Sequence, residues 1–251
     1  MDTIDKLNKE FSTQDFSETQ QYADMLNTYK TVACNYSKME NAIAVLSDLK
    51  SKVSYIYYGG FARMLDTGVV QENTEVASIW EDEIFRLIHP DDLAAKHLQE
   101  LCFYHFIKKQ PKRNRSDYYM MAKLRMKTGT DSYIQVLHRI FYVTTPSDGT
   151  LWLAICLYSP LVFNIPSQCI FVNSTNGEII KQEKQNNAKI LSSREKQILA
   201  LISKGLSSKG IAQMLSISVH TVSRHRQEIL EKLQVKNSIE ACRVAKDLEL
   251  I

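Results

Sequence analysis

Strand-like runs dominate the middle of the chain. Five stretches are rich in β-branched and aromatic residues, and segments such as Lys-Thr-Gly-Thr-Asp and Pro-Ser-Asp-Gly separate them. This pattern is typical of strands joined by short turns. The predicted strands are 42–47, 53–58, 118–127, 133–144 and 151–159, and an Asn-Ser-Thr-Asn-Gly turn between 169–172 and 178–181 predicts a further hairpin.

Helical spacing of apolar residues marks other parts of the same region. An amphipathic helix is predicted over 17–40, where tyrosine, methionine and leucine recur at intervals of three and four residues. Short helices are expected at 61–65 and 75–80. A longer helix is expected to start at Pro90, because proline and the two acids that follow suit a first helical turn. Strands and helices in this order predict an α+β fold with an antiparallel sheet and flanking helices.

Four short helical patterns follow a polar connection at 181–189, which has no large apolar residue. Ser192 and Glu195 have the spacing of a capping box, and Gly205 is a natural C-terminal stop for the helix that this box begins. The four helices are expected to begin after Ser192, near Ser208, after Ser218 and near Asn237. This part of the chain is therefore predicted to be all-α.

The patterns predict four parts in the chain. These are an N-terminal helical extension at 1–40, a sheet domain at 41–160, a hairpin and linker at 161–188, and a four-helix domain at 189–251. Charge supports the last division, because residues 188–251 carry eleven Lys and Arg against six Asp and Glu, a net charge of +5. The rest of the chain has a net charge of −2. A basic module of this kind is either a polyanion-binding module or a well-solvated surface.

The segment Ser218–Leu233 separates into two faces when it is placed on a helix. One face is an apolar stripe that is expected to pack against the other helices. The other face has no large apolar residue and carries donors and acceptors that reach base edges. The stripe consists of Val222, Ile229, Leu230 and Leu233, and the polar face of His220, Ser223, Arg224 and Gln227.

This polar face predicts an interface that reads DNA bases. Arg can pair with guanine and Gln with adenine, each through two hydrogen bonds. A solvated helix face is the alternative, but a helix, a Ser-Ile-Ser turn and a capped second helix are what a helix-turn-helix needs to enter the major groove. His225 is expected mainly to pack, with one ring nitrogen toward a phosphate. The residues expected near the DNA backbone are Lys209, Ser218, Thr221, His225, Arg226 and Lys232.

Composition excludes several other classes of protein. The sequence has no apolar run long enough for a transmembrane helix, and its first residues mix charges of both signs, so a cytoplasmic protein is expected. Its five cysteines are far apart and predict reduced thiols. No nucleophile–base pair, phosphate-binding glycine loop or metal-ligand spacing is present, so neither an enzyme nor a metal site nor a resident cofactor is expected.

The C-terminal sixty residues resemble the LuxR-type helix-turn-helix family. Four motifs carry the resemblance: Leu191-Ser-Ser-Arg-Glu-Lys-Gln-Ile-Leu, Gly205-Leu-Ser-Ser-Lys-Gly-Ile-Ala-Gln-Met-Leu, Ile217-Ser-Val-His-Thr-Val-Ser-Arg-His and Ile229-Leu-Glu-Lys-Leu. The resemblance implies that Ser218, Thr221 and Val222 begin the recognition helix, and that Ser223, Arg224 and Gln227 face bases. It also implies that His225 and Lys232 pack or reach the DNA backbone, and that the last helix, 238–250, mediates dimerisation. One departure is Gly210, where the family commonly has Glu.

The order of elements from Asn41 to Ser159 resembles a PAS domain, with Ile88-His-Pro-Asp-Asp-Leu93 as the clearest motif. The resemblance implies a domain that senses a ligand or mediates dimerisation. His97 and His105 lie where some members hold haem, but a lone His is a weak signal, and no cofactor is expected. Aromatic side chains of this region are interpreted as core, with a small-molecule cavity as the alternative.

The combined interpretation is a sequence-specific transcriptional regulator whose PAS-like domain senses a signal or mediates dimerisation. Its expected partners are double-stranded DNA and a second copy of the chain. RNA polymerase and an unidentified small molecule remain open as further partners, and no membrane is expected. One alternative is a sigma-like promoter-recognition factor, which would need an all-helical N-terminal half. The other is a ligand-binding or protein-interaction module without specific DNA binding.

Overall fold

The computed structural model describes residues 3–14, 22–65, 73–145, 150–165, 169–180, 191–233, 235–247 and 250–251. The described residues fall into two compact units. One unit lies within 11–93 and 107–181 and contains the sheet, and the other lies within 1–10, 94–106 and 182–251 and contains the C-terminal helices.

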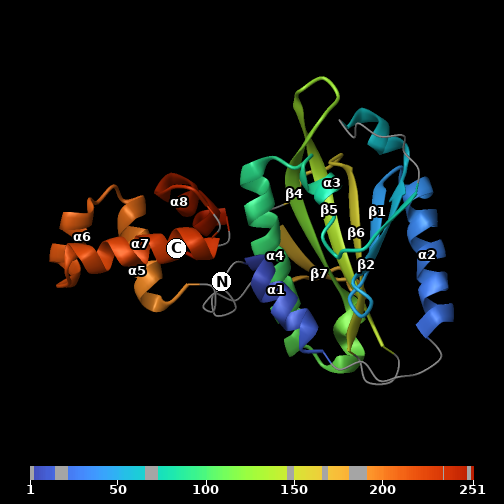
Figure 1. Cartoon of the computed structure of the whole chain (residues 1–251), viewed down its shortest axis with the longest axis horizontal. Helices are drawn as coiled ribbons and strands as arrows, with labels where there is room; N and C mark the ends of the chain where they lie inside the picture. The colour runs from blue at the N-terminus through green and yellow to red at the C-terminus, as the bar shows by residue number, and fades with distance from the viewer. Residues whose placement is uncertain are drawn as a thin grey trace. The chain divides into compact units, whose positions relative to one another are not determined.

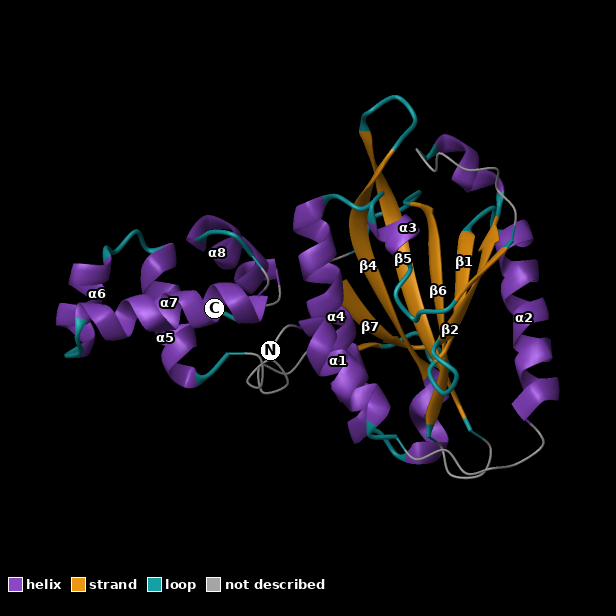
Figure 2. Ribbon diagram, viewed as in Figure 1, coloured by secondary structure: helices purple, strands orange, loops and turns teal. Residues whose placement is uncertain are grey.

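The sheet is antiparallel throughout and has eight strands in the order β3-β2-β1-β6-β5-β4-β7-β8 (Figures 1 and 2). The α+β fold class with an antiparallel sheet is therefore confirmed, and this half is not the all-helical one that a sigma-like factor would need. The strands are β1 (Ile43–Asp48), β2 (Val53–Tyr58), β3 (Thr74–Val76), β4 (Tyr118–Lys127), β5 (Tyr133–Thr144), β6 (Leu151–Pro160), β7 (Cys169–Asn173) and β8 (Ile179–Ile180).

Helix α2 (Tyr22–Met39) covers one face of the sheet beside β1 and β2 (Figure 1). The buried side chains between them include Ala33 of α2 and Trp152 of β6. The indole Nε1–H of Trp152 donates to Asp48 Oδ1 over 3.0 Å, so the polar atom of this buried ring is satisfied. Tyr55 and Tyr57 pack against the same cluster, which supports their interpretation as core residues.

The opposite face of the sheet is apolar with a few buried polar side chains. Ser47 and Ser54 are register partners on β1 and β2, and their hydroxyls lie 2.9 Å apart. The Glu81 carboxylate accepts from both, over 3.1 and 3.4 Å. Hydroxyl donors satisfy this buried acid, as burial of a polar group requires.

The strand predictions for this region agree with the structure to within a residue or two, and the hairpin of β7 and β8 is present. The helix predicted at 75–80 is wrong. Residues 74–76 instead form the edge strand β3, paired with β2, and a single helical turn, α3 (Asp82–Phe85), follows later. Pairing with β2 decides the conformation of this short segment, because a helix of only a few residues has little stability on its own. Residues 17–21 of the predicted first helix and the predicted connection at 181–189 lie outside the described residues.

Helix α4 begins as predicted at Pro90, and His89 Nδ1 accepts the Asp91 backbone N–H over 3.3 Å. The Asp92 carboxylate in its first turn binds the guanidinium of Arg125 on β4 through two hydrogen bonds of 2.8 and 2.7 Å. This fork joins the start of the helix to the sheet. Helix α4 spans Pro90–Lys109, and the remaining helical elements among the described residues before 181 are α1 (Thr3–Ser12) and the 3₁₀ turns η1 (Gly60–Met64) and η2 (Lys112–Asp117).

Four helices form the C-terminal module, which we define as α5 to α8. No helix among the described residues is both long and apolar enough to cross a membrane. The buried side chains of the module come from all four helices and include Ile198, Leu199, Ile211, Val222, Ile229, Leu233, Ala241 and Val244. The helices are α5 (Ser193–Ser203), α6 (Ser208–Leu215), α7 (Val219–Leu233) and α8 (Ser238–Asp247).

Gly210 in the first turn of α6 has space for a side chain. An added Cβ would come no nearer than 3.7 Å to Ser207 Oγ, an ordinary contact distance. Gly210→Ala is therefore expected to raise the free energy of unfolding by about 0.5–1 kcal/mol, because glycine loses more backbone entropy in a helix. Differential scanning calorimetry measures the shift. Gly205→Ala is the control and should lower the free energy of unfolding, because Gly205 has φ +84°, a conformation that strains a residue with a Cβ. A Gly210→Ala variant that melts earlier than the parent contradicts the prediction.

Candidate nucleic-acid interface

The turn between α6 and α7 is formed by local capping. Ser216 adopts a left-handed conformation with φ 52° and ends α6, as short polar residues do at helix ends. Ser218 Oγ then accepts the Thr221 backbone N–H over 3.0 Å, which confirms Ser218 as the N-cap of α7. The three-residue turn between α6 and α7 is the connection of a helix-turn-helix, with α7 as its second helix.

The inward face of α7 is largely the predicted stripe. Val222, Ile229 and Leu233 are fully buried, whereas Leu230 is only half-buried. Leu230 differs because it faces a surface concavity rather than the core of the module. With three apolar side chains fixed inward, the rotation of α7 about its axis is set, and so is the direction of its polar face.

All four residues predicted to face bases are exposed on α7: His220, Ser223, Arg224 and Gln227. The Arg224 side chain is 66% exposed, and its Nε lies 3.3 Å from Glu228 Oε1. This ion pair engages Nε, and the two terminal nitrogens of the Arg224 guanidinium are a pair of donors that match a partner with two acceptors. The base-reading role of these residues stays a prediction.

Glu228 belongs to this site, although the sequence reasoning did not select it. Its second oxygen lies 3.0 Å from His225 Nδ1, and because an ionised carboxylate only accepts, the two hydrogen-bond when this nitrogen carries the proton. Glu228 therefore orients the side chains of Arg224 and His225 together. The sequence contained a signal for this role. Glu228 is four residues after Arg224 and three after His225, and residues at these spacings are neighbours on a helix.

The residues predicted near the DNA backbone differ in their surroundings. Lys209 and Ser218 are exposed, and the hydroxyl of half-buried Thr221 lies 2.8 Å from Ser218 Oγ. His225, Arg226 and Lys232 are half-buried and have intramolecular partners. Phosphate contact by these six residues stays a prediction, and the last three also have a role within the module.

Glu195 joins the beginning of α5 to the end of α7. Its carboxylate is almost fully buried, accepts from the Ser192 backbone N–H over 2.7 Å, and binds Lys232 Nζ over 2.6 and 2.8 Å. Burial raises the pKa of this carboxyl, but the hydrogen bonds from Lys232 and Ser192 outweigh burial and hold the pKa below its ordinary value. The ionised form is therefore the one that stabilises the module.

Acid is expected to weaken the C-terminal module through Glu195. Because the folded-state pKa is depressed, the contribution is complete above the unfolded-state pKa of about 4.3 and is lost as pH falls through the lower folded value. Urea unfolding monitored by the NMR resonances of α5 and α7 at pH 7 and at low pH measures the loss. In Glu195→Gln the decline should be smaller, and an equal decline in both proteins contradicts the assignment.

Glu195, His225 and Glu228 also lie close enough to share a metal ion, with one ligand atom of each within 4.8 Å of the others. No metal site was predicted from the sequence, and Glu195 comes near the other two residues because α5 packs on α7. Lys232 already neutralises Glu195, and His225 already donates to Glu228. The cluster therefore has the charge balance of an ion-pair network within the protein.

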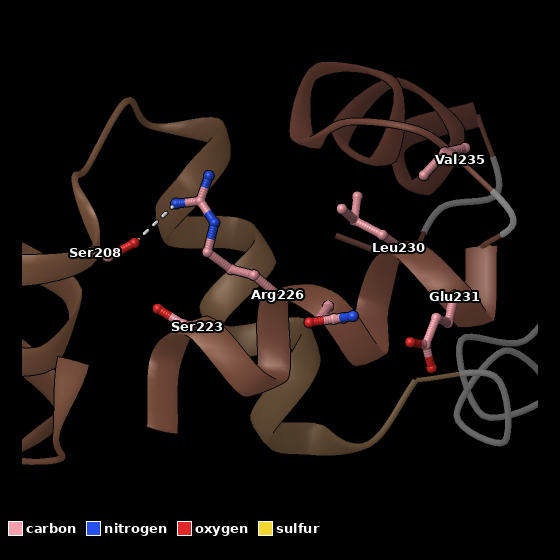
Figure 3. A pocket seen from close by; sticks show the side chains of 7 residues that line it. Ser208, Ser223, Arg226, Leu230, Glu231 and Val235 are labelled. Atoms are coloured by element: carbon pink, nitrogen blue, oxygen red, sulfur yellow. Dashed lines mark hydrogen bonds between the residues drawn. The ribbon is translucent and has the colours of Figure 1, made fainter. Parts of the chain in front are cut away.

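A surface concavity of about 550 Å³ adjoins the polar face of α7 (Figure 3). Ser223 and Gln227 of the polar face contribute to its lining, and so does the half-buried Leu230. Arg226 extends from α7 toward Ser208, and its Nη1 donates to Ser208 Oγ over 3.2 Å (Figure 3). The residues that line it are Ser208, Ser223, Arg226, Gln227, Leu230, Glu231 and Val235.

Residues 189–245 match the family described as "Bacterial regulatory proteins, luxR family". The matched residues include the capping box of α5, the turn between α6 and α7, and the whole of α7. The C-terminal module is therefore a LuxR-family helix-turn-helix domain, as the sequence motifs implied. The match covers this module and leaves the sheet unit outside it.

Known regulatory proteins are similar to part of the chain. The chain is 43% identical to the transcriptional regulatory protein DesR of Bacillus subtilis over 68 residues, which are 27% of this chain and 34% of DesR. It is 38% identical to the oxygen regulatory protein NreC of Staphylococcus carnosus over 81 residues, 32% of this chain and 36% of NreC. The chain thus spans about a third of the length of these relatives.

Solved structures resemble the chain more weakly. The match to the phage VqmA–DPO complex spans 91% of this chain and 91% of the chain in that complex, with 15% sequence identity and a TM-score of 0.32. The match to a structure of the Vibrio cholerae VqmA dimer spans 90% of this chain and 88% of the VqmA chain, with 12% sequence identity and a TM-score of 0.31. These scores are too low to carry an argument about function.

Proposed function

We propose that the protein is a sequence-specific DNA-binding transcriptional regulator and not an enzyme. The observation that carries the proposal is the exposed polar face of α7 within a LuxR-family helix-turn-helix domain. In this proposal the recognition helix, Ser218–Leu233, enters the major groove, where side chains of this length reach base edges. The proposed base-contacting residues are His220, Ser223, Arg224 and Gln227.

The proposed phosphate contacts lie on the flanks of the same helix and on α6. Lys209 and Ser218 are exposed there, and Thr221 lies beside Ser218. Contacts of this kind fix the register of a protein on the duplex without carrying sequence information. The net charge of +5 on residues 188–251 supports an acidic partner for this module.

We further propose that the sheet unit is a PAS-like sensory or dimerising domain in a cytoplasmic homodimer. The antiparallel sheet, the covering helix α2 and the Ile88–Leu93 motif at the start of α4 support this proposal. In this organisation, residues 41–160 form the PAS-like domain and residues 189–251 the DNA-binding domain. A small-molecule ligand and RNA polymerase are the further partners that it implies.

Selection of bound sequences from random DNA tests the proposal. The full chain should enrich one motif, and mobility shifts at fixed salt should show it bound about 10³-fold or more tightly than a scrambled duplex. A palindromic motif would support a dimer with twofold symmetry. Equal binding of selected and scrambled DNA would reject sequence-specific recognition and favour a ligand-binding or protein-interaction module instead.

A further inference from the structure

Arg226 connects three helices of the C-terminal module. It projects from α7, its Nη1 donates to Ser208 Oγ over 3.2 Å, and its Nη2 donates to Ser238 Oγ over 2.9 Å. Ser208 is the first residue of α6 and Ser238 the first residue of α8. One planar guanidinium therefore fixes the beginnings of two helices to the middle of a third.

The partners of Arg226 distinguish it from other cations of the module. Lys232 binds Glu195 and Arg224 binds Glu228, so a carboxylate balances each charge. Among the described residues, the hydrogen bonds of Arg226 go to two neutral serine hydroxyls. The arrangement thus uses the fork geometry of the guanidinium rather than an ion pair, which a lysine ammonium does not reproduce.

Arg226 also lies next to the polar face of α7. Ser223 is three residues before it and Gln227 one residue after it, and all three side chains line the same concavity (Figure 3). Since residues on one rigid helix turn together, a shift of Arg226 relative to α6 changes the direction of Ser223 and Gln227. Base reading tolerates little error of this kind, because hydrogen bonds weaken steeply with misalignment.

We propose that Arg226 is a positioning residue for DNA recognition. By bridging Ser208 and Ser238, it holds α6, α7 and α8 at one mutual orientation and thereby sets the angle at which α7 presents its polar face. In this role Arg226 affects sequence discrimination through the orientation of α7 and contacts neither a base nor a phosphate, which replaces the phosphate contact predicted for it from the sequence. The proposal rests on the proposed function, because it concerns how the same interface achieves specificity.

A Ser208→Ala/Ser238→Ala double variant tests the proposal, because it keeps Arg226 and its charge but removes both acceptors. Affinities of the full chain for the selected duplex and for a scrambled duplex are measured at several salt concentrations. We expect specific affinity to fall about tenfold, as for the loss of one base-directed hydrogen bond through misalignment of the polar face, while affinity for scrambled DNA stays unchanged. Arg226→Lys should show the same loss, and the salt dependence should be unchanged in both variants.

The alternatives give different results. If Arg226 binds a phosphate, the double serine variant keeps the parent's specific affinity, and Arg226→Met lowers the slope of log affinity against log salt by about one. If the bridge only stabilises the fold, thermal unfolding shifts while the folded double variant discriminates as the parent does. Either result overturns the proposal. A parent protein that does not discriminate between the two duplexes instead rejects the proposed function itself.

Discussion

Replacing Glu195 by Ala is expected to lower the free energy of unfolding of the C-terminal module by about 2–3 kcal/mol. The substitution removes the acid of the capping box, which binds the Ser192 backbone N–H, and leaves Lys232 without its carboxylate. The side chain of Lys232 is 34% exposed, so water compensates part of its charge and the loss stays below that of a fully buried pair. Urea unfolding followed by the NMR resonances of α5 and α7 measures the change.

Two variants show which interaction is responsible. Glu231→Ala removes an exposed acid on α7 and should change stability by less than about 0.5 kcal/mol. Lys232→Met removes the other partner of the ion pair, and a double-mutant cycle with Glu195→Ala should give a coupling free energy between these residues. If Glu195→Ala unfolds at the same urea concentration as Glu231→Ala, the carboxylate does not hold α5 to α7.

The sequence predicted the C-terminal module well because its helix limits depend on local signals. Ser192 with Glu195, Gly205 and Ser218 act within a few residues of themselves, and the structure has caps or stops at each. The exposure of the polar face also followed from helical geometry alone, once the apolar stripe was assigned to the core.

Interactions between distant residues were not predictable in the same way. The ion pair of Glu195 with Lys232 spans 37 positions, and Arg226 reaches residues 18 and 12 positions away. From the sequence, the helical positions of Arg226 and Lys232 predicted the DNA flank, and the family resemblance implied that Lys232 packs or reaches the DNA backbone. Which serine or carboxylate they contact depends on how α5, α6 and α8 pack on α7, and no local pattern encodes that packing.

The strand pairings of the sheet were likewise not predictable from local sequence. The strands were predicted from composition, but the pairing of β1 with β6 joins segments more than a hundred residues apart and needs tertiary structure. Residues 75 and 76 of β3 were assigned to a helix at 75–80 because a segment of this length carries too little pattern to separate helix from strand. Their pairing with β2 decides the outcome.

Arg224→Ala is expected to weaken binding to the selected DNA site by roughly 10- to 100-fold, which corresponds to about 1–3 kcal/mol for a bidentate contact to guanine. The Arg224 side chain is 66% exposed, and its Nε lies 3.3 Å from Glu228 Oε1, so an ion pair restricts the side chain before DNA binds. A preoriented side chain loses less conformational entropy on binding. Repeating the selection from random DNA with the variant should relax one base position.

Lys209→Ala is the matched control, because Lys209 is an exposed cation of the same module on α6. Loss of a phosphate contact lowers affinity about equally for all sequences and reduces the salt slope by about one, whereas loss of a base contact lowers discrimination. If α7 reads bases and α6 lies along the DNA backbone, Arg224→Ala therefore lowers discrimination between sequences, and Lys209→Ala lowers affinity for all sequences and the salt slope. An Arg224→Ala protein that keeps the parent's affinity and base preference would show that the polar face of α7 does not read the sequence through Arg224.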